Sequence, residues 1–423
     1  MKSEDNNIMK NVIFIIYFSP PYDVYKTLPE ENSWITENGN VVHIFGYDFG
    51  DLLLKALTDY YSNYNCEIWQ PDLIADKIYT AQFNERLVHR NFPAKKIKIF
   101  NKFKFCKDVY SKYLLEYIKK YDNKENIFMI SSSNYLNGRK IAKYIKKANK
   151  LYYCFFNLQL LLPDKIETNN PLKIVNSWIK NHNKIRWLKQ VKNLLTGDNN
   201  PEALTNLKKI ISDINYFIFD FGIDCDFWGP VIEKSEARKI LGIPQESFVI
   251  LLSQRLVPVY QVDKFIECLS KVNAERDYKC YITGHGTLEY ETYLKELVIK
   301  YDLQHIVNFV GYVEDNVLRY YFISADLFVT VPYISAGSYS AAKAMCIGVP
   351  IFHSTTGDSY EFLKKHNAGE FVSPCDYDEW TEKLEDIING KIKVKTVPRE
   401  EVVNYYSWKR TADDLHYALM NLK

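Results

Sequence analysis

The chain has 423 residues, which is more than a single hydrophobic core usually holds, so we expect two domains. Its eight cysteines include no C-x-x-C pair, which excludes a disulfide framework or a zinc site and favours buried, reduced thiols. The only apolar run near the N-terminus, Val12–Phe18, is too short for a signal peptide or a membrane span, so we expect a cytoplasmic protein.

The N-terminal part of the chain alternates short apolar runs with amphipathic segments. The pattern predicts strands at Asn11–Phe18, Cys66–Trp69, Ile97–Phe100, Asn126–Ser131 and Leu151–Phe156, and helices at Asp51–Tyr61, Val109–Tyr121 and Gly138–Lys150. Between the first strand and the first helix, Ser19–Asn40 has prolines and charges without a period, which favours a loop facing an active site. Such alternation is typical of βαβ units and a parallel sheet.

The segment between residues 85 and 150 is strongly basic. It carries 18 Lys and Arg against 5 Asp and Glu, a local charge of +13 that leaves −11 for the remainder of a chain with net charge +2. Between Lys95 and Lys150, aromatic residues are interleaved with these lysines. Such a face suits anionic lipid headgroups. Two other interpretations stay open, namely a solvated surface whose aromatics belong to the core, which is the commoner outcome, and nucleic-acid binding, which is the least favoured.

The next part of the chain leads into a second domain. Leu172–Ile211 is expected to be mostly helical, and Phe219–Pro230 is expected to join the two domains. From Glu233 to about Arg399 the strand–helix alternation returns, which predicts a second doubly wound domain. A final helix is predicted at Trp408–Leu422.

Two turns of the second domain are candidates for ligand binding. In the first, Gly284-His285-Gly286 follows a predicted strand, where open α/β sheets bind ligands. A lone G-x-G is more often a tight turn than a site, and His285 is a better candidate for a polar wall than for an acid or base.

The second turn lies between a strand at Leu327–Val329 and a helix at Ser340–Cys346. Its small and hydroxylic residues, Ser335–Ser338, feed the N-terminus of that helix. Unpaired N–H groups and the helix dipole favour an anion there, although any α/β domain contains such turns.

Six motifs between Phe221 and Trp408 together resemble one enzyme family. In chain order they are Phe221–Asp224 with Phe227 and Pro230, Ser235–Pro244, Ile250–Pro258, Tyr281–Gly286, Val307–Tyr312 and Tyr405–Trp408. Each is weak alone, but their order and spacing resemble the retaining GT-B glycosyltransferases of family 4, which use nucleotide sugars.

The resemblance implies an α/β fold with two Rossmann-like doubly wound domains facing across a cleft. Residues 1–225, completed by a crossover helix in 405–423, would form the acceptor-side domain. Residues 230–404 would form the domain that binds the donor nucleotide sugar.

The resemblance also implies a site. Its catalytic charges would be Arg255 and Lys343, and its donor-binding residues would be Gly284, His285, Tyr312, Val313, Ser335, Ala336, Gly337, Ser338 and Tyr339. Arg255 keeps the guanidinium fork that suits phosphate oxygens. The family's two glutamates are replaced here by Ser335 and Lys343, and a lysine that usually follows the arginine is replaced by Tyr260. Lys343 is expected either to supply the positive charge lost at Tyr260 or to be a solvated helix lysine.

The implied function is transfer of a sugar from a nucleotide diphosphate sugar to a glycan, lipid-linked or protein acceptor, with retained configuration. No metal or cofactor is expected beside the donor substrate. Expected partners are the nucleotide sugar, the acceptor, an anionic membrane surface bound through residues 95–150, and a partner glycosyltransferase; the location would be the cytoplasm or the periphery of the membrane's inner face.

Two alternatives follow from the replaced residues. The chain could be a catalytically inactive GT-B-like subunit that binds substrate for a partner glycosyltransferase or stabilises it. It could also be an enzyme whose donor carries additional negative charge, since Ser335 and Lys343 suit such charge better than two glutamates.

Overall fold

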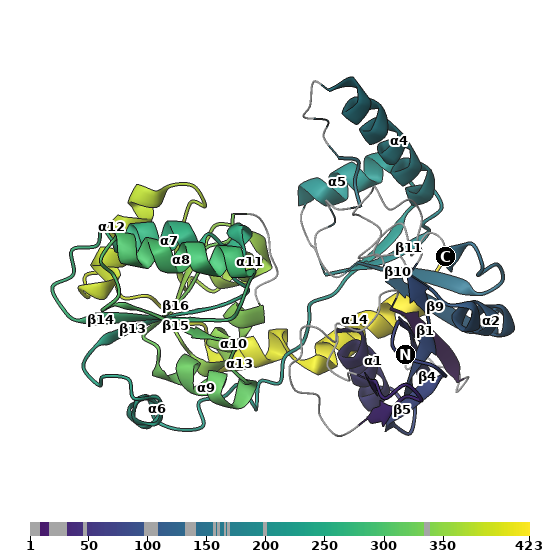
Figure 1. The fold of residues 1–423 in the computed structure, drawn as a ribbon, viewed down its shortest axis with the longest axis horizontal. Helices are drawn as coiled ribbons and strands as arrows, with labels where there is room; N and C mark the ends of the chain where they lie inside the picture. The colour runs from purple at the N-terminus through teal and green to yellow at the C-terminus, as the bar shows by residue number, and fades with distance from the viewer. Residues whose placement is uncertain are drawn as a thin grey trace, which may run out of the picture. The chain divides into compact units, whose positions relative to one another are not determined.

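The structure is a computed structural model that describes residues 9–16, 32–44, 49–96, 109–131, 141–154, 158, 161–164, 166, 170–197, 201–333 and 339–423. The chain forms two compact units (Figure 1). Unit 1 comprises Met1–Phe221 and Trp408–Lys423, and unit 2 comprises Gly222–Ser407. Across the described ranges, no helix is both long enough and apolar enough to cross a bilayer.

Unit 1 is built on a mostly parallel sheet of eight strands. In spatial order they are β12 (Asn215–Ile218), β11 (Asn193–Thr196), β10 (Asn149–Cys154), β9 (Asn126–Ser131), β1 (Lys10–Ile15), β4 (Tyr64–Asp72), β6 (Leu87–Pro93) and β5 (Tyr79–Asn84). Only the edge strand β5 runs antiparallel to its neighbour. Two small antiparallel pairs accompany the sheet, β2 (Ser33–Ile35) with β3 (Val41–His43) and β7 (Lys95–Lys96) with β8 (Val109–Tyr110).

Helices pack on both faces of this sheet. Those within the described residues are α1 (Phe49–Tyr60), α2 (Lys112–Tyr121), α4 (Pro171–Leu188), of which only the C-terminal end is buried, α5 (Pro201–Ile210) and α14 (Trp408–Met420). The C-terminal helix α14 returns to unit 1 and packs along α1 (Figure 1). The Tyr61 hydroxyl donates to Asp413 Oδ1 at 2.5 Å, and the Tyr64 hydroxyl lies 2.9 Å from His416 Nδ1.

Leu172–Ile211 is mostly helical, as expected, because α4 and α5 occupy most of it, but the short strand β11, which was not expected, separates the two helices. One expectation for the N-terminal part was wrong: the segment Ser19–Asn40 is not simply a loop, since its described end contains β2. The strand expected at Ile97–Phe100 lies outside the described residues.

Unit 2 is built on a fully parallel sheet of six strands. In spatial order they are β15 (Val307–Gly311), β14 (Tyr278–Thr283), β13 (Phe248–Ser253), β16 (Leu327–Thr330), β17 (Ile351–Ser354) and β18 (Glu370–Val372). Its helices are α6 (Lys234–Leu241), α7 (Val262–Leu269), α8 (Leu288–Lys300), α9 (Asp315–Ser324), α10 (Tyr339–Ile347), α11 (Gly357–Lys365), α12 (Tyr377–Ile388) and α13 (Arg399–Tyr405), with a 3₁₀ turn, η2, at Pro258–Tyr260.

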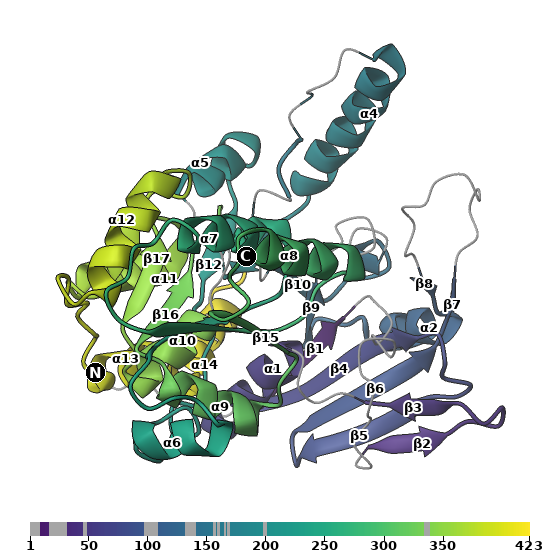
Figure 2. The same ribbon diagram turned by 60° about the vertical axis from the view of Figure 1, so that its left-hand side comes forward.

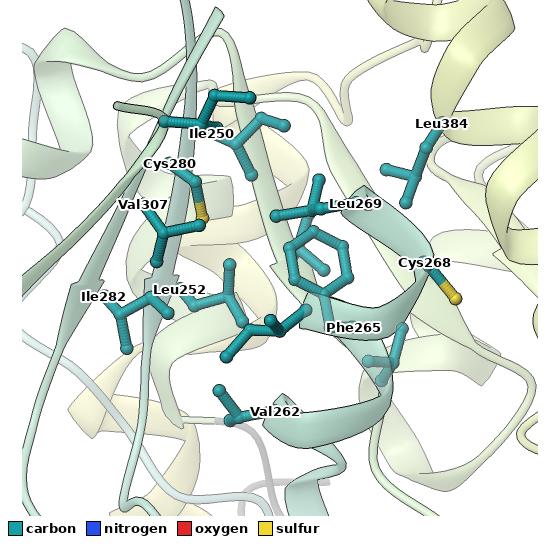
Figure 3. Packing of buried hydrophobic residues seen from close by; sticks show 14 of the residues in the cluster. Ile250, Leu252, Val262, Phe265, Cys268, Leu269, Cys280, Ile282, Val307 and Leu384 are labelled. Atoms are coloured by element: carbon teal, nitrogen blue, oxygen red, sulfur yellow. The ribbon is translucent and has the colours of Figure 1, made fainter. Parts of the chain in front are cut away.

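Side chains alternate along the central strand β13 and fill two separate cores. Ile250 and Leu252 point to one face, where α7, α8 and α12 cover them. Figure 3 shows Phe265 of α7 packed against this face with Leu269 beside it. Val249 and Leu251 point to the other face, which α6, α9, α10 and α13 cover. Burial on both faces explains why β13 reads as a continuous apolar run in the sequence.

Candidate functional site

The candidate site lies at the edge of the unit 2 sheet where its strands end. Because all six strands are parallel, the loops after β13, β14, β15 and β16 meet at one edge, which is where open α/β sheets bind ligands. These loops carry Arg255, His285 and Tyr312, and the loop after β16 leads into α10. Ser335, Ala336, Gly337 and Ser338 lie outside the described residues.

Two glycines allow the loops after β13 and β14 to touch. A Cβ on Gly284 would overlap the carbonyl oxygen of Gln254, and Gly284 also has a φ of +114°. A Cβ on Gly286 would likewise overlap the carbonyl oxygen of Leu256. The Leu256 N–H donates to the His285 carbonyl at 2.9 Å, so the close approach is held by a backbone hydrogen bond. The G-x-G motif therefore has a structural reason that needs no ligand.

This close approach presents the Arg255 and His285 side chains to solvent. Both are exposed, and Arg255 has no ion-pair partner within the described part of the chain. An unpaired guanidinium at a ligand-binding edge is available to an incoming anion.

His285 lies beside Tyr312, the residue that follows β15. Their ring centroids are 5.9 Å apart in an edge-on arrangement, and Tyr312 is 63% exposed. Val313 is half-buried and packs against the core on the α9 side. The structure thus brings together His285 and Tyr312 from two adjacent strand ends, where they offer flat aromatic surfaces to a ligand.

Lys343 is not a solvated helix lysine, so that expectation was wrong. Only 8% of the residue is exposed. Its Nζ lies 3.9 Å from the centroid of the Trp228 ring and 5.3 Å from that of Tyr339. It also donates to Asp315 Oδ1 at 3.1 Å. Burial lowers the pKa of Lys343, and the neighbouring Asp315 carboxylate opposes that shift.

Asp315 is the first residue of α9 and follows the Tyr312–Val313 turn closely. Its side chain is 62% exposed although it binds the Lys343 ammonium. The salt bridge therefore connects the start of α9 with α10. Sequence reasoning missed both Asp315 and Trp228. Asp315 lies 28 residues and Trp228 about 115 residues before Lys343 in the chain, so no local pattern reveals either contact.

The helix α10 is also fixed at its C-terminal end. Arg399 donates to the carbonyl oxygens of Cys346 at 2.8 Å and Cys225 at 2.9 Å. The Sγ atoms of these two cysteines lie 3.0 Å apart, and both residues are buried. Arg399 and the two cysteines thus connect the segment before α6 to the C-terminal end of α10.

The sequence analysis also missed Gln261, whose side chain connects the segments that follow β16 and β18. It has a φ of 52°, and its Nε2 donates to the carbonyl oxygens of Val331 and Pro374, both at 2.9 Å. Tyr260, which precedes it, is half-buried. A glutamine after a proline-containing turn gives no sequence signal for these two hydrogen bonds.

The described residues contain no group of three or more His, Cys, Asp or Glu placed to hold a metal ion. The charged groups near this edge include the exposed Arg255, the Lys343–Asp315 pair, and Glu291, whose carboxylate accepts from the Gly286 N–H at 2.6 Å. Such a set can bind a polar, negatively charged ligand through hydrogen bonds and charge.

Comparison with known proteins shows what the domain that carries this site is similar to. Residues 233–404 match the family described as "Glycosyl transferases group 1". This match confirms the resemblance predicted from the sequence. An uncharacterized glycosyltransferase of Methanocaldococcus jannaschii is 25% identical over 219 residues, which cover 51% of this chain and 54% of that protein.

A second relative is the GDP-mannose-dependent monoacylated alpha-(1-6)-phosphatidylinositol monomannoside mannosyltransferase of Corynebacterium glutamicum. It is 27% identical over 201 residues, which cover 44% of this chain and 51% of that protein. The chain therefore spans about half the length of the curated relatives it matches.

Solved structures extend the likeness to both units. Sucrose-phosphate synthase from Thermosynechococcus elongatus has a TM-score of 0.68 at 14% identity, covering 97% of this chain and 98% of that one. Anabaena HepE, solved in complex with UDP-glucose, has a TM-score of 0.66 at 12% identity, covering 98% and 100%. These likenesses confirm the predicted GT-B fold with two Rossmann-like domains.

Proposed function

Because residues 233–404 match the family of group 1 glycosyl transferases, we propose that the chain is a retaining glycosyltransferase. It transfers a sugar from a nucleotide diphosphate sugar to a glycan, lipid-linked or protein acceptor. The observation that carries the proposal is the set of Arg255, His285, Tyr312 and the Lys343–Asp315 pair along the carboxyl edge of one parallel sheet.

In this proposal unit 2 binds the donor. Arg255 binds the diphosphate, because its guanidinium is exposed and has no other ion pair among the described residues. His285 and Tyr312 form a polar and aromatic wall for the nucleotide, with backbone groups of Val313 meeting the base. Gly284 allows the close turn, Ser335, Ala336, Gly337, Ser338 and Tyr339 complete the donor site of this proposal, and the N–H groups of Gly337 to Tyr339 are its candidates for binding the phosphates.

Lys343 supplies the second catalytic charge. An ammonium has three donor hydrogens, and Asp315 Oδ1 accepts from it at 3.1 Å, which leaves capacity for an oxygen of the donor. The Trp228 ring at 3.9 Å holds the ammonium by a cation–π contact. This support keeps positive charge at the site although Tyr260 replaces the family's usual lysine.

The chemistry needs positioning and charge stabilisation. The bond between the anomeric carbon and the diphosphate oxygen breaks. An acceptor oxygen bonds to the anomeric carbon on the same face, and its proton passes to the leaving diphosphate oxygen. The leaving diphosphate gains negative charge, which Arg255 and Lys343 stabilise. The acceptor is held by unit 1.

We also propose that unit 1 contacts an anionic membrane surface through the basic segment 95–150, in a cytoplasmic protein. Lys95 and Lys96 are exposed, as are the rings of Tyr110 and Tyr113 at 47% and 48%. Tyr117 instead packs on Trp69. The aromatics of this segment are therefore divided between surface and core, and only the exposed ones support the proposal.

The second candidate function is that of an inactive subunit that binds substrate for a partner glycosyltransferase. It is favoured by Lys343, which stands where the family has a glutamate and already binds a carboxylate. A donor with additional negative charge would fit the same substitution while keeping the activity.

The deciding experiment is a thermal-shift series with UDP, GDP, ADP and CMP and with their sugar conjugates, including UDP-glucose and GDP-mannose. A saturable rise in Tm with one nucleotide diphosphate is expected, followed by sugar transfer from its conjugate to a glycan or lipid-linked acceptor. No rise with any of these ligands would contradict the donor site and favour the inactive subunit.

A further inference from the structure

The helix α4 of unit 1 exposes an unusual amount of apolar surface. Five of its apolar side chains face solvent, namely Leu172 (83% exposed), Ile174 (38%), Val175 (55%), Trp178 (62%) and Ile179 (48%). At 100° per residue, Leu172, Val175 and Ile179 form one line along the helix, with Trp178 beside it. Soluble proteins rarely leave such a contiguous patch uncovered unless it binds something.

Among the described residues, the contacts that fix this helix to unit 1 lie in its C-terminal half. Near its C-terminus, Trp187 and Leu188 are buried in the unit 1 core, and Lys184 Nζ donates to the Leu162 carbonyl at 2.8 Å. The preceding turns extend away from the sheet of unit 1 in both ribbon views (Figures 1 and 2). At the other end, Asn170 accepts from the N–H groups of Leu172 and Lys173, so the helix is capped. The apolar face is therefore preformed.

The charges of α4 have a single sign. The helix contains four basic residues, Lys173, Lys180, Lys184 and Arg186, and no acidic residue. Asp164 binds two of them, Lys180 at 2.6 Å and Lys184 at 2.7 Å. Lys173 and Arg186 are exposed and have no ion-pair partner in the described ranges. By the same spacing, Arg186 continues the apolar line beyond Ile179, whereas Lys173 lies about 100° to one side of Leu172. Both would meet negative charge at the margin of that face.

We propose that the exposed face of α4 docks on an anionic lipid bilayer. Leu172, Val175 and Ile179 enter the boundary between headgroups and acyl chains, and Trp178 sits at headgroup depth, where an amphipathic ring is favoured. Lys173 and Arg186 bind anionic headgroups. Pairing with a second copy of this helix is disfavoured, because it would bring cations of the same sign together. This surface is distinct from the segment 95–150 and independent of the donor site.

The test is co-sedimentation of the full chain with vesicles of phosphatidylcholine and 30% phosphatidylglycerol at low salt. The double variant Leu172→Glu/Val175→Glu should bind at least tenfold more weakly than wild type. Leu288→Glu is the matched control, because Leu288 is 78% exposed on α8 of unit 2 and should leave binding unchanged. Lys173→Glu/Arg186→Glu should also weaken binding, and raised salt should weaken wild-type binding.

A second measurement works on wild-type protein. Dibrominated lipids should quench its tryptophan fluorescence, and Trp178→Phe should remove most of this quenching. The proposal is overturned if wild type stays in the supernatant, or if Leu172→Glu/Val175→Glu binds normally while Lys95→Glu/Lys96→Glu does not. A wild-type dimer that Leu172→Glu/Val175→Glu converts to a monomer, with vesicle binding unchanged, would identify a protein interface instead. The nucleotide-induced rise in Tm, measured on the same variants, reports on the donor site separately.

Discussion

Lys343 on α10 binds Asp315 at the start of α9, with its Nζ 3.1 Å from Oδ1. The lysine is almost fully buried while the aspartate stays 62% exposed at its side chain. The pair thus joins a buried positive charge to a solvent-facing carboxylate at the edge of the unit 2 sheet. This arrangement explains how a lysine can replace a glutamate on this helix without leaving a buried charge unpaired.

Shortening Lys343 should destabilise unit 2. Lys343→Ala removes the cation–π contact with Trp228 and leaves a cavity between two rings, so we expect a loss of about 2 kcal/mol in the free energy of unfolding. Lys343→Met keeps most of the stem and should lose about 1 kcal/mol. Urea denaturation measures both. Equal losses would show that the stem does not contribute by packing.

Removing Arg255 should weaken nucleotide binding without affecting stability. Because its side chain is exposed and has no ion pair among the described residues, Arg255→Ala should change the free energy of unfolding by less than about 0.5 kcal/mol. Loss of a charge-assisted phosphate contact, about 1.5–3 kcal/mol, should raise the Kd of the nucleotide diphosphate at least tenfold. Titration calorimetry measures the Kd, with the exposed Lys239→Ala on α6 as the control. An unchanged Kd would remove Arg255 from the site.

A methyl group at Gly284 should disrupt the site's backbone. Its Cβ would overlap the Gln254 carbonyl, and φ is +114°, so Gly284→Ala should cost more than about 2 kcal/mol. Gly242→Ala is the matched control, since its φ is +67° but nothing lies within 4 Å of its Cβ; it should cost about 1 kcal/mol. Thermal unfolding of the two variants gives the comparison, and similar Tm values would argue against the close approach.

The pH dependence of stability should contain a contribution from Asp414 on α14. Burial raises its pKa to about 6 from 3.8, while Arg410 opposes this. Between these two values the folded state binds more protons than the unfolded state, so this contribution weakens stability as pH rises through that range. Asp414→Asn should therefore be more stable than wild type at pH 7, by about 1 kcal/mol after allowance for solvent screening.

Denaturation of Asp414→Asn and wild type from pH 4 to pH 7 checks this expectation. The difference in unfolding free energy between them should grow with pH and be small near pH 4. A difference that is constant over the whole range would mean that the carboxyl titrates normally.

The strand predicted at Leu327–Val329 is confirmed as β16, and it was predictable because both faces of the unit 2 sheet are covered. A strand such as β13 is then apolar at every position and stands out from its surroundings. The missed strand β11 has only four residues and begins with Asn193, whose side chain donates to backbone carbonyls that a local pattern cannot reveal.

At the candidate site, the strand ends were predictable but the contacts between them were not. Parallel topology alone brings His285 near Tyr312. The burial of Lys343 depends on Trp228 and Asp315, which reach it only in the folded unit. Local sequence favours exposure for any lysine on a helix, so tertiary contacts decided that outcome.

The return of α14 to unit 1 has a consequence for synthesis on the ribosome. Its partner α1 is made near the beginning of the chain, whereas Trp408–Met420 emerges only after all of Gly222–Ser407. Until then the apolar side of α1 lacks its cover, and closing so long a connection is slow. Unit 2 is continuous in sequence and can fold before α14 is made. During that time the N-terminal part of the chain is incompletely folded and is exposed to aggregation. A stop codon before residue 408 would therefore impair unit 1, although the change lies far from α1 in the sequence.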